Sequence, residues 1–578
     1  MSFEQVVGEK ENRLEFLTST PPMLPRQVVT LAFLSKHLPS ALMSAQLAAS
    51  LCAESSGVSV VLVRLQPSER PPSFLDAYDE GRATAVDWAP SEVMLQGQFG
   101  MPSSLIRTET GFHLLTLNVH GETSSPENIA SLVAQLRRQF RYVLVEALAD
   151  ETPTPGLLEF LVQSDLAYLF LQGTTEDVYH VDLLIRKLRP RCQKPSGCFK
   201  PILCLAEGEQ ANGFDLLIQR VATPVHMYVR QCPTAAAGKD PGAPGGLTSL
   251  FKADLRRLAR EISGRLLGLA LSSGAAKGFS HIGVIQVLEE NGIEVDVVAG
   301  ASIGAYIGSV WAYGHDGREM ERLAREMEGR WRLWSVIDPV FPPRQGFLRG
   351  LALKRRLMRS IGTSRFADLQ RPLRVVAGNL VTLERTVFAS GEVATAVHAS
   401  IAVPGICVPV TIDGETYIDG GVVDPVPVDI LREMGVSRII AVNAIPTPDR
   451  IRYSLQAEQE LARAKAGRGD RARRLFRKVV PLEQQLNYFA RGNLFEIVMR
   501  SVHGAQVRLA EASCGLADVA LRPDICDDRW LDCRNPGRFI ALGRDVAERH
   551  LEEIKALVAR KEPNHEREHT PRPMAAVA

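Results

Sequence analysis

The sequence predicts an α/β protein built from two domains, and three observations support this fold class. The first half of the chain alternates short apolar runs with helix-like stretches, the pattern of a parallel sheet covered by helices. The stretch 231–249, QCPTAAAGKDPGAPGGLTS, is rich in Gly, Pro and Ala, which is typical of a boundary between domains. The second half opens with the apolar run Leu266–Leu271 and continues with small-residue loops between further strand-like and helix-like segments.

Length and composition agree with this organisation. The chain has 578 residues, of which 45% are hydrophobic and 23% charged, as in globular proteins of several domains. We place an N-terminal α/β domain at 1–230 and a second α/β domain at 263–560. Between them we expect a flexible linker at 231–262, and after them a disordered tail at 561–578.

The predicted elements of the first half follow one another in strand–helix order. The strands are expected at Val28–Leu34, Val58–Leu65, Phe112–Leu117, Tyr142–Glu146 and Leu166–Leu171. Helices are expected between them, for example at Ser40–Cys52 and Pro126–Phe140. This order predicts a doubly wound parallel sheet.

The N-terminal alternation resembles the partition-ATPase and MinD-like P-loop fold, but the phosphate-binding residues of that family are missing. Where the family has a lysine- and glycine-rich loop, this chain has Lys36–Leu42, with Ala41 in place of the phosphate lysine and Leu42 in place of the magnesium-binding hydroxyl. Arg64 and Gln66 end the second strand, where the family has acidic residues. A phosphate cradle needs small residues and a cation. The resemblance implies a degenerate domain without bound nucleotide or ATPase activity. Any other doubly wound domain is an equal alternative.

Composition also disfavours several functional classes. The net charge is +1, so no global field attracts nucleic acid. The chain contains no run of about 18 apolar residues, so a membrane span is not expected. The first residues lack the apolar core of a signal peptide. The nine cysteines show no CxxC or Cys/His spacing, which fits reduced thiols in a cytoplasm and suggests no metal. We therefore expect a cytoplasmic protein.

The most informative motif is the pentapeptide Gly300–Gly304 (GASIG). It lies between the strand-like run Val295–Ala299 and the helix-like run Ala305–Tyr313. A serine flanked at two residues by glycines, at a strand-to-helix junction, is typical of a nucleophile elbow. Its tight turn leaves no room for side chains at Gly300 and Gly304, and it exposes the hydroxyl of Ser302.

A loop of small residues precedes this motif. Ser272–Gly278 (SSGAAKG) follows the apolar run Leu266–Leu271 and precedes a helix that is expected to end at Gly292. Small residues at a helix N-terminus let backbone N–H groups point at one space, where they stabilise the oxyanion of an acyl-transfer transition state. The alternative is a loop that merely allows helix and strand to pack closely.

A serine needs a base, and the sequence offers an aspartate more clearly than a histidine. Asp419-Gly420-Gly421 follows a short apolar stretch, and the two glycines permit close backbone approach. Asp413-Gly414, just upstream, is interpreted as an ordinary hairpin turn. A Ser-His-Asp site would need one of several downstream histidines, none of which lies in a recognisable catalytic loop. They are His315, His398, His503, His550, His565 and His569.

These three motifs, in this order, resemble a patatin-like phospholipase. Four segments are similar to the bacterial branch of that family related to neuropathy target esterase. They are LALSSGAAKGFSHIGVIQVLEE, GASIGAYIG, ASIAVPGICVPV and YIDGGVVDPVPV. The resemblance is strong over 266–440 and weaker to about 555. It implies an α/β/α sandwich and a Ser–Asp dyad without metal or cofactor.

The resemblance assigns roles residue by residue. Ser302 would be the nucleophile and Asp419 the base. The backbone around Gly274, Ala275 and Ala276 would form the oxyanion hole, with Lys277 supporting the loop. The family loop has more glycines, so the Cβ of Ala275 is expected to be tolerable only at a negative φ. Asp424, where the family often has Asn, is interpreted as a turn residue.

Other segments surround this core. The stretch 399–405 is read as scaffold near the dyad, and 337–348 as a loop over the pocket, where Leu348, Leu351 and Leu353 would meet an acyl chain or simply form core. The stretch 463–478 is rich in Lys and Arg, and apolar residues follow it to 482. We interpret the segment 463–482 as one that binds an anionic membrane. The alternative is a solvated basic loop. The last elements are a helix at Asn493–Ala510, a strand at Asp518–Pro523 and a closing helix at Arg544–Val558.

The leading hypothesis is a serine acyl hydrolase that releases fatty acid from phospholipid or lysophospholipid through an acyl-enzyme. One alternative is a weakly active or inactive membrane-associated scaffold, and another is a Ser-His-Asp carboxylesterase. Nucleic acid is not an expected partner, because the basic segment lacks interleaved aromatic residues. Peripheral contact with the inner membrane is the expected variation on a cytoplasmic location.

Overall fold

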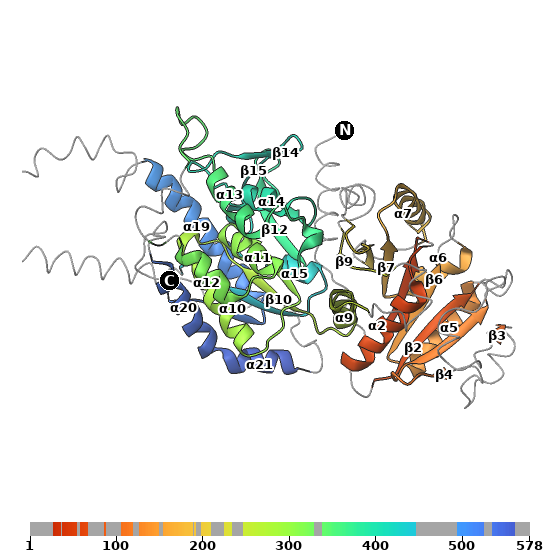
Figure 1. Cartoon of the computed structure of the whole chain (residues 1–578). Coiled ribbons are helices and arrows are strands. Elements are labelled where there is room, and N and C mark those ends of the chain that lie inside the picture. Colours follow the sequence, from red (N-terminus) through yellow and green to blue (C-terminus); the bar gives the residue numbers. More distant parts are fainter. Residues whose placement is uncertain are drawn as a thin grey trace, which may run out of the picture. The chain divides into compact units, whose positions relative to one another are not determined.

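The computed structural model contains two compact α/β units (Figure 1). The first comprises residues up to Leu266 together with Glu433–Ser437, and the second comprises Leu267–Arg432 and Arg438–Arg560. The structure describes residues 27–35, 37–54, 58–66, 86–87, 106–118, 126–148, 154–188, 190–191, 198–209, 225–233, 247–326, 328, 338–446, 494–524 and 535–560. The predicted tail at 561–578, the basic segment 463–482 and the linker residues 234–246 lie outside this set.

The first unit is built on a predominantly parallel sheet. Its strands are β1 (Gln27–Phe33), β2 (Val60–Gln66), β3 (Val86–Asp87), β4 (Ile106–Arg107), β5 (His113–Asn118), β6 (Tyr142–Leu148), β7 (Leu166–Leu171), β8 (Phe199–Cys204) and β9 (Met227–Val229). The order is β3-β5-β2-β6-β1-β7-β8-β9, with β4 antiparallel to β5. The helices are α2 (Ser40–Glu54), α5 (Pro126–Gln139), α6 (Pro155–Gln163), α7 (Thr175–Leu188) and α9 (Ser249–Ile262).

The five strands predicted in this half are confirmed to within two residues at their ends. All seven residues of the central strand β1 are buried, as expected for a parallel strand with both faces covered. The prediction missed β3, β4, β8 and β9. Strands β3, β4 and β9 are only two or three residues long, and β8 contains Pro201, an unusual residue between two paired strands.

The loop after β1 lies where the resemblance to P-loop proteins would place a phosphate. Its backbone N–H groups bind within the loop itself: His37 N to Ser35 Oγ at 3.4 Å, Leu38 N to Ser35 O at 3.4 Å and Ser40 N to Leu38 O at 2.9 Å. The Leu38 side chain is buried. Arg64, at the end of β2, is also buried and pairs with Glu146 of β6 at 3.2 Å. These side chains serve the core of the sheet.

The predicted linker extends too far. Its last part, from Ser249 to Ile262, is helix α9, which packs against α2 in the first unit. Thr248 caps the helix by accepting a hydrogen bond from Phe251 N at 3.2 Å. Phe251 and Leu255 recur at helical spacing and are fully buried, so this segment forms a helix although it follows the Gly/Pro-rich stretch.

The second unit has a mixed sheet. Its strands are β10 (Leu267–Leu271), β11 (Val297–Ala301), β12 (Leu373–Asn379), β13 (Arg385–Phe388), β14 (Val410–Ile412), β15 (Glu415–Asp419), β16 (Arg438–Val442) and β17 (Val519–Leu521). The order is β14-β15-β12-β11-β10-β16-β17, with β13 paired to β12. Strands β12, β11, β10, β16 and β17 are parallel, whereas β13, β14 and β15 pair in antiparallel fashion. The predicted α/β class therefore holds for both units.

Helices and short 3₁₀ turns connect these strands. They are η4 (Ala275–Phe279), α10 (Ser280–Glu290), α11 (Ile303–Tyr313), α12 (Gly317–Arg325), α13 (Leu351–Ile361), η6 (Phe366–Asp368), α14 (Val393–Ser400), η7 (Gly420–Val422), α15 (Val428–Glu433), α19 (Leu494–Gly515), α20 (Pro536–Arg549) and α21 (Leu551–Ala559). None of the helices in the described part of the chain is long and apolar enough to cross a membrane.

Two turn predictions and one helix prediction can be compared with the structure. Gly292, after α10, has a φ of 64°, which fits the expected glycine stop. Asp413 and Gly414 form the turn of the β14–β15 hairpin with φ of 50° and 87°, as that interpretation requires. The single closing helix was wrong: the chain leaves helical geometry at His550, which separates α20 from α21.

Candidate active site

Ser302 occupies a strained turn between β11 and α11. Its backbone has φ 54° and ψ −122°, a conformation that L-residues rarely adopt. A Cβ on Gly300 would lie 2.6 Å from Ala305 N, and one on Gly304 would lie 2.2 Å from Leu271 O. Both glycines are therefore required by close backbone approach, as the elbow interpretation predicts. The turn is fixed from outside by Ser400, whose Oγ accepts Ser302 N at 2.8 Å.

Asp419, at the end of β15, lies directly beside this serine. Ser302 Oγ donates a hydrogen bond to Asp419 Oδ2 at 2.5 Å, although the two residues are 117 positions apart in sequence. The second oxygen, Oδ1, accepts Gly421 N at 2.7 Å, and Asp419 N donates to Ala402 O at 2.9 Å. Both side chains are buried. The carboxylate is thus held rigidly by its own backbone turn and faces the serine.

Burial sets the protonation behaviour of this carboxyl group. Desolvation raises the pKa of Asp419 to about 6, even though the hydrogen bonds from Ser302 and Gly421 favour the charged form. An acid with this pKa is ionised at neutral pH and binds a proton readily. This is the range in which a carboxylate works best as a general base.

The small-residue loop packs against both members of the pair. A Cβ on Gly278 would lie 2.3 Å from Ile303 Cγ2, next to the serine, and one on Gly421 would lie 2.6 Å from Ser273. Gly274, Ala275 and Ala276 lie at the start of η4, where a helix leaves its first N–H groups without internal partners. The three sequence motifs therefore meet at one place in the second unit.

One expectation about this loop was wrong. The Cβ of Ala275 was expected only at a negative φ, but Ala275 has a φ of 50°. Close packing of the loop between β10 and α11 imposes this conformation despite the steric cost to an alanine. The backbone of the loop has thus kept a left-handed shape that a glycine would adopt freely.

Further contacts hold the loop in place. Ser272 Oγ donates to Ser273 O at 2.7 Å and accepts Ala444 N at 2.8 Å. The buried His281 donates its Nε2–H to Ser272 O at 2.9 Å, and burial lowers the pKa of His281 to about 4. Lys277 is buried, and its N–H donates to Gly274 O at 3.2 Å. The neutral His281 and the buried Ser272 are supports that sequence reasoning missed.

Asp424 has more contacts than the predicted turn residue. Its buried carboxylate accepts Arg385 Nη1 at 2.9 Å, and its N–H donates to Gly420 O at 2.9 Å. Burial and the neighbouring Asp429 raise the pKa of Asp424 to about 6, against the attraction of Arg385. This pairing ties the turn that follows Asp419 to strand β13.

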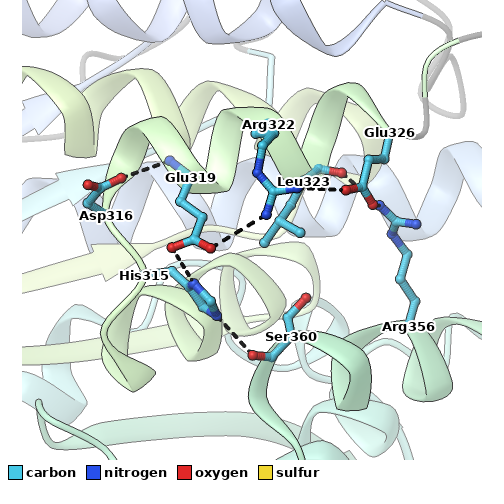
Figure 2. A network of polar contacts seen from close by, with 8 residues as sticks. All are labelled: His315, Asp316, Glu319, Arg322, Leu323, Glu326, Arg356 and Ser360. Atoms are coloured by element: carbon cyan, nitrogen blue, oxygen red, sulfur yellow. Dashed lines mark hydrogen bonds and ion pairs between the residues drawn. The ribbon is translucent and has the colours of Figure 1, made fainter.

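Three of the candidate histidines form hydrogen bonds with residues other than Ser302 and Asp419. Figure 2 shows His315 between Glu319 of α12, at 2.8 Å, and the Ser360 carbonyl of α13, also at 2.8 Å. His398 Nε2 donates to Arg349 O at 3.1 Å, and His550 Nδ1 donates to Val546 O at 2.9 Å. His565 and His569 lie outside the described residues.

His503 of α19 is a candidate histidine that feels the charge of Lys277 in the small-residue loop. Burial and the charge of Lys277 lower its pKa, while a hydrogen bond with Gln506 opposes that shift. The described residues record no hydrogen bond between His503 and Ser302. The hydroxyl of Ser302 is instead directed at Asp419.

The comparison with known families falls on this same region. Residues 269–432 match the family model for patatin-like phospholipase. The C-terminal unit contains a patatin domain. The match begins in β10 and ends in α15, so it includes the small-residue loop, Ser302 and Asp419.

Similar curated proteins include lysophospholipases. Lysophospholipase NTE1 of Yarrowia lipolytica is 34% identical over 197 residues, and lysophospholipase NTE1 of Saccharomyces cerevisiae is 32% identical over 200 residues. Each alignment covers 34% of this chain, but only 14% and 12% of the respective relative. The chain thus spans a small part of the length of these relatives.

Solved structures give weaker similarities. A ParA family ATPase from Chlorobium tepidum is 16% identical, with a TM-score of 0.31, and covers 40% of this chain and 97% of its own. MinD of Aquifex aeolicus is 15% identical, with a TM-score of 0.32, and covers 41% and 97%. VipD of Legionella pneumophila is 17% identical, with a TM-score of 0.26, and covers 50% and 67%.

Proposed function

We propose that the second unit is a serine acyl hydrolase that cleaves a carboxylic ester of a phospholipid or lysophospholipid. The observation that carries this proposal is the 2.5 Å hydrogen bond from Ser302 Oγ to the buried carboxylate of Asp419. Ser302 itself lies at a strained elbow. The patatin match and the names of the lysophospholipase relatives support the class of substrate. The alignment covers only 14% of the Yarrowia relative, so the proposal concerns the chemistry of the second unit alone.

The chemistry follows from the two side chains. Asp419 accepts the hydroxyl proton as Ser302 Oγ attacks the ester carbonyl, and a tetrahedral oxyanion forms. Collapse of this intermediate expels the alcohol, which takes the proton back from Asp419, and leaves an acyl group on Ser302. A water molecule, deprotonated by the same carboxylate, then attacks the acyl group and forms a second tetrahedral intermediate. Its collapse releases the fatty acid, and Ser302 Oγ takes the proton back from Asp419. Each of the two half-reactions thus returns Asp419 to its starting charge.

The N-terminal end of η4 is proposed to stabilise the oxyanion. The backbone N–H groups of Gly274, Ala275 and Ala276 lie at that end, and Gly278 packs against the residue that follows Ser302. Donors that are fixed before the reaction stabilise charge that develops only in the transition state. Lys277 and His281 are proposed to hold this loop, and neither is assigned a chemical step.

The test is release of fatty acid from mixed phospholipids and lysophospholipids by the wild type and by Ser302→Ala and Asp419→Asn. Both substitutions should abolish release. Ser309→Ala is the matched control, because Ser309 is a buried serine on α11 that donates to Tyr306 O and does not face Asp419. Labelling by a fluorophosphonate probe should require Ser302 and be unaffected by Ser309→Ala.

Three outcomes would overturn this assignment. Release that survives Ser302→Ala would remove Ser302 as nucleophile. Loss of activity in His503→Ala, with activity kept in Asp419→Asn, would favour the Ser-His-Asp alternative. Absence of both release and serine labelling in the wild type would favour the non-catalytic scaffold.

A further inference from the structure

Two loops of the second unit present isolated apolar side chains to solvent. In the loop before α13, Phe341 is 96% exposed and Phe347 is also exposed, as is Leu351 at the first position of α13. In the turn between β12 and β13, Val381 is 74% exposed and Leu383 is 76% exposed. Single exposed apolar residues are common on protein surfaces, but several large ones at the tips of two loops indicate an interaction site.

The β12–β13 turn projects from the edge of the sheet that carries Ser302. In the parallel pairing of β11 with β12, Ala301 lies opposite Val376. The strand continues for three more residues to Asn379, so the turn begins roughly 10 Å beyond the level of the elbow at about 3.3 Å per residue. Asp419 pairs with Ala377 at the same edge.

The loop before α13 reaches the same edge by a different route. Ala402 accepts the N–H of Asp419, and the chain then runs through Val403 to Ile406. The carbonyl of Ile406 accepts Phe347 N at 2.8 Å. Within the second unit, α13, α14 and the β14–β15 hairpin lie at one end and α21 at the other (Figure 1). Phe347 is thus linked to the candidate site by a short run of bonded backbone.

Positive charge accompanies these apolar residues. Arg344, Arg349 and Arg355 are all exposed. Asp338 is the acidic residue of this stretch, and its carboxylate is bound by Gly350 N and Ala352 N, both at 2.9 Å, at the start of α13. The other tip carries one acid, Glu384, next to Leu383. Segments that lie in the headgroup region of anionic bilayers typically combine exposed aromatic and aliphatic side chains with arginines.

We propose that these two loops, 338–351 and 380–383, form a docking surface for an anionic phospholipid bilayer. Phe341, Val381 and Leu383 would enter the boundary between headgroups and acyl chains, and the arginines would meet lipid phosphates. This inference rests on the proposed function for its purpose, since docking there brings the edge that carries Ser302 to the substrate. A protein partner is disfavoured, because such interfaces have a contiguous apolar core and not separate tips.

The experiment measures vesicle binding without turnover. Full-length Ser302→Ala protein is sedimented with vesicles of phosphatidylcholine containing one quarter phosphatidylglycerol, and with vesicles of phosphatidylcholine alone. In this background Phe341→Ser, and separately Val381→Ser with Leu383→Asn, should each weaken binding to the anionic vesicles about tenfold. Asparagine is chosen at 383 because the φ of 61° there suits it. Tyr179→Ser, at a 63% exposed residue of α7, is the matched control and should bind like the parent.

The electrostatic part is tested by Arg344→Gln with Arg349→Gln. This variant should lose the preference for anionic vesicles and bind both compositions equally. Tip variants that bind anionic vesicles as well as the parent would overturn the proposal. So would a concentration-dependent dimer that the tip variants dissociate, because the surface would then be covered by a second copy of the chain.

Hydrolysis of a short-chain soluble ester separates this proposal from the proposed function. With Ser302 present, the tip variants should hydrolyse that ester at the wild-type rate, since none of the changed residues contacts Ser302 or Asp419. A wild type that binds vesicles through the tips but hydrolyses no ester would contradict the proposed function and leave the docking surface standing. Loss of soluble-ester hydrolysis in both tip variants would overturn the docking assignment, since the tips would then belong to the site.

Discussion

Glu261 in the first unit and Asp419 in the second are both deeply buried carboxylates, and their pKa values are shifted in opposite directions. In the first unit, Glu261 of α9 accepts a hydrogen bond from His226 at 2.8 Å and also pairs with Lys200. Burial alone would raise its pKa, but the two cationic partners lower it to about 2. In the second unit, the side-chain partners of Asp419 among the described residues are a hydroxyl and a backbone N–H, and burial raises its pKa to about 6.

The difference supports the different roles proposed for the two carboxylates. Glu261 is neutralised by its neighbours and stays ionised, so it fastens α9 to β8 and the start of β9. Within the described part of the chain, no cation holds the charge of Asp419, which in the proposed mechanism leaves it able to accept a proton from the serine beside it. The backbone at Ser302 is also strained, because this residue has a positive φ. No described residue of the loop after β1 has a positive φ. Strain and an unneutralised acid together mark a site of chemistry.

The largest expected effect is on activity at Asp419. Asp419→Asn should lower kcat/KM by about 10²–10⁴-fold, the usual contribution of a general base. The same variant should unfold at an equal or higher temperature than the wild type at pH 7. The raised pKa means that ionising Asp419 in the folded protein costs roughly 3 kcal/mol, and the neutral amide avoids this cost.

Kinetics and thermal unfolding of the same preparation provide the measurement. The sign of the stability effect distinguishes a catalytic carboxylate from a structural one. A marked loss of thermal stability in Asp419→Asn would mean that Asp419 is a structural anchor like Glu261, and the contrast between the units would fail.

The next largest effect is on stability at Glu261. Glu261→Gln should lower the free energy of unfolding by about 3–5 kcal/mol, because it leaves the buried cationic partners without a counter-charge. The activity per folded molecule on a soluble ester should be unchanged. Arg256→Gln, which removes an exposed ion pair from the same helix, should cost under about 1 kcal/mol. Denaturant unfolding of the full chain measures both, and an equal, small effect of the two variants would contradict the anchoring role.

The two carboxylates should also separate along the pH axis. The kcat/KM for a soluble ester should rise about tenfold per pH unit below pH 6 and level off above it, because Asp419 must be ionised to accept the proton. The folded pKa of Glu261 lies below its ordinary value, so its contribution to stability is full above about pH 4.5 and is lost as the pH falls towards 2. Circular dichroism should therefore stay native while activity falls, and a coincident loss of both would contradict this separation.

The parts of the site that the sequence could predict are those that impose a local backbone demand. Ser302 and Asp419 each stand beside glycines that no other residue could replace without a clash, and that demand is visible in a few letters. Ser400 and His281 support the site from other elements through single hydrogen bonds. Such contacts arise only when α14 and α10 pack in place, so no short pattern encodes them.

Composition misled the prediction in one region and left another open. The linker was drawn to 262 because Gly and Pro dominate its first part, although Phe251, Leu255 and Leu258 already recur at helical spacing. The exposed position of Phe341 could not be predicted, because an apolar residue in a loop is consistent with either burial or contact with a partner. The degenerate reading of Lys36–Leu42 stays a prediction that binding of ATP by the full chain would test.

The smallest expected effect sharpens the contrast at the level of the backbone. Ala275 carries a Cβ at a φ of 50°, whereas the loop after β1 contains no described residue with a positive φ. Ala275→Gly should therefore raise the free energy of unfolding by up to about 1 kcal/mol, since relief of the steric cost exceeds the added entropy of the unfolded chain. Catalysis should change little if the alanine only tolerates the loop shape. Replacement by glycine that instead destabilises the protein would mean that the left-handed turn is not strained, and that the loop owes its shape to contacts of the alanine methyl group.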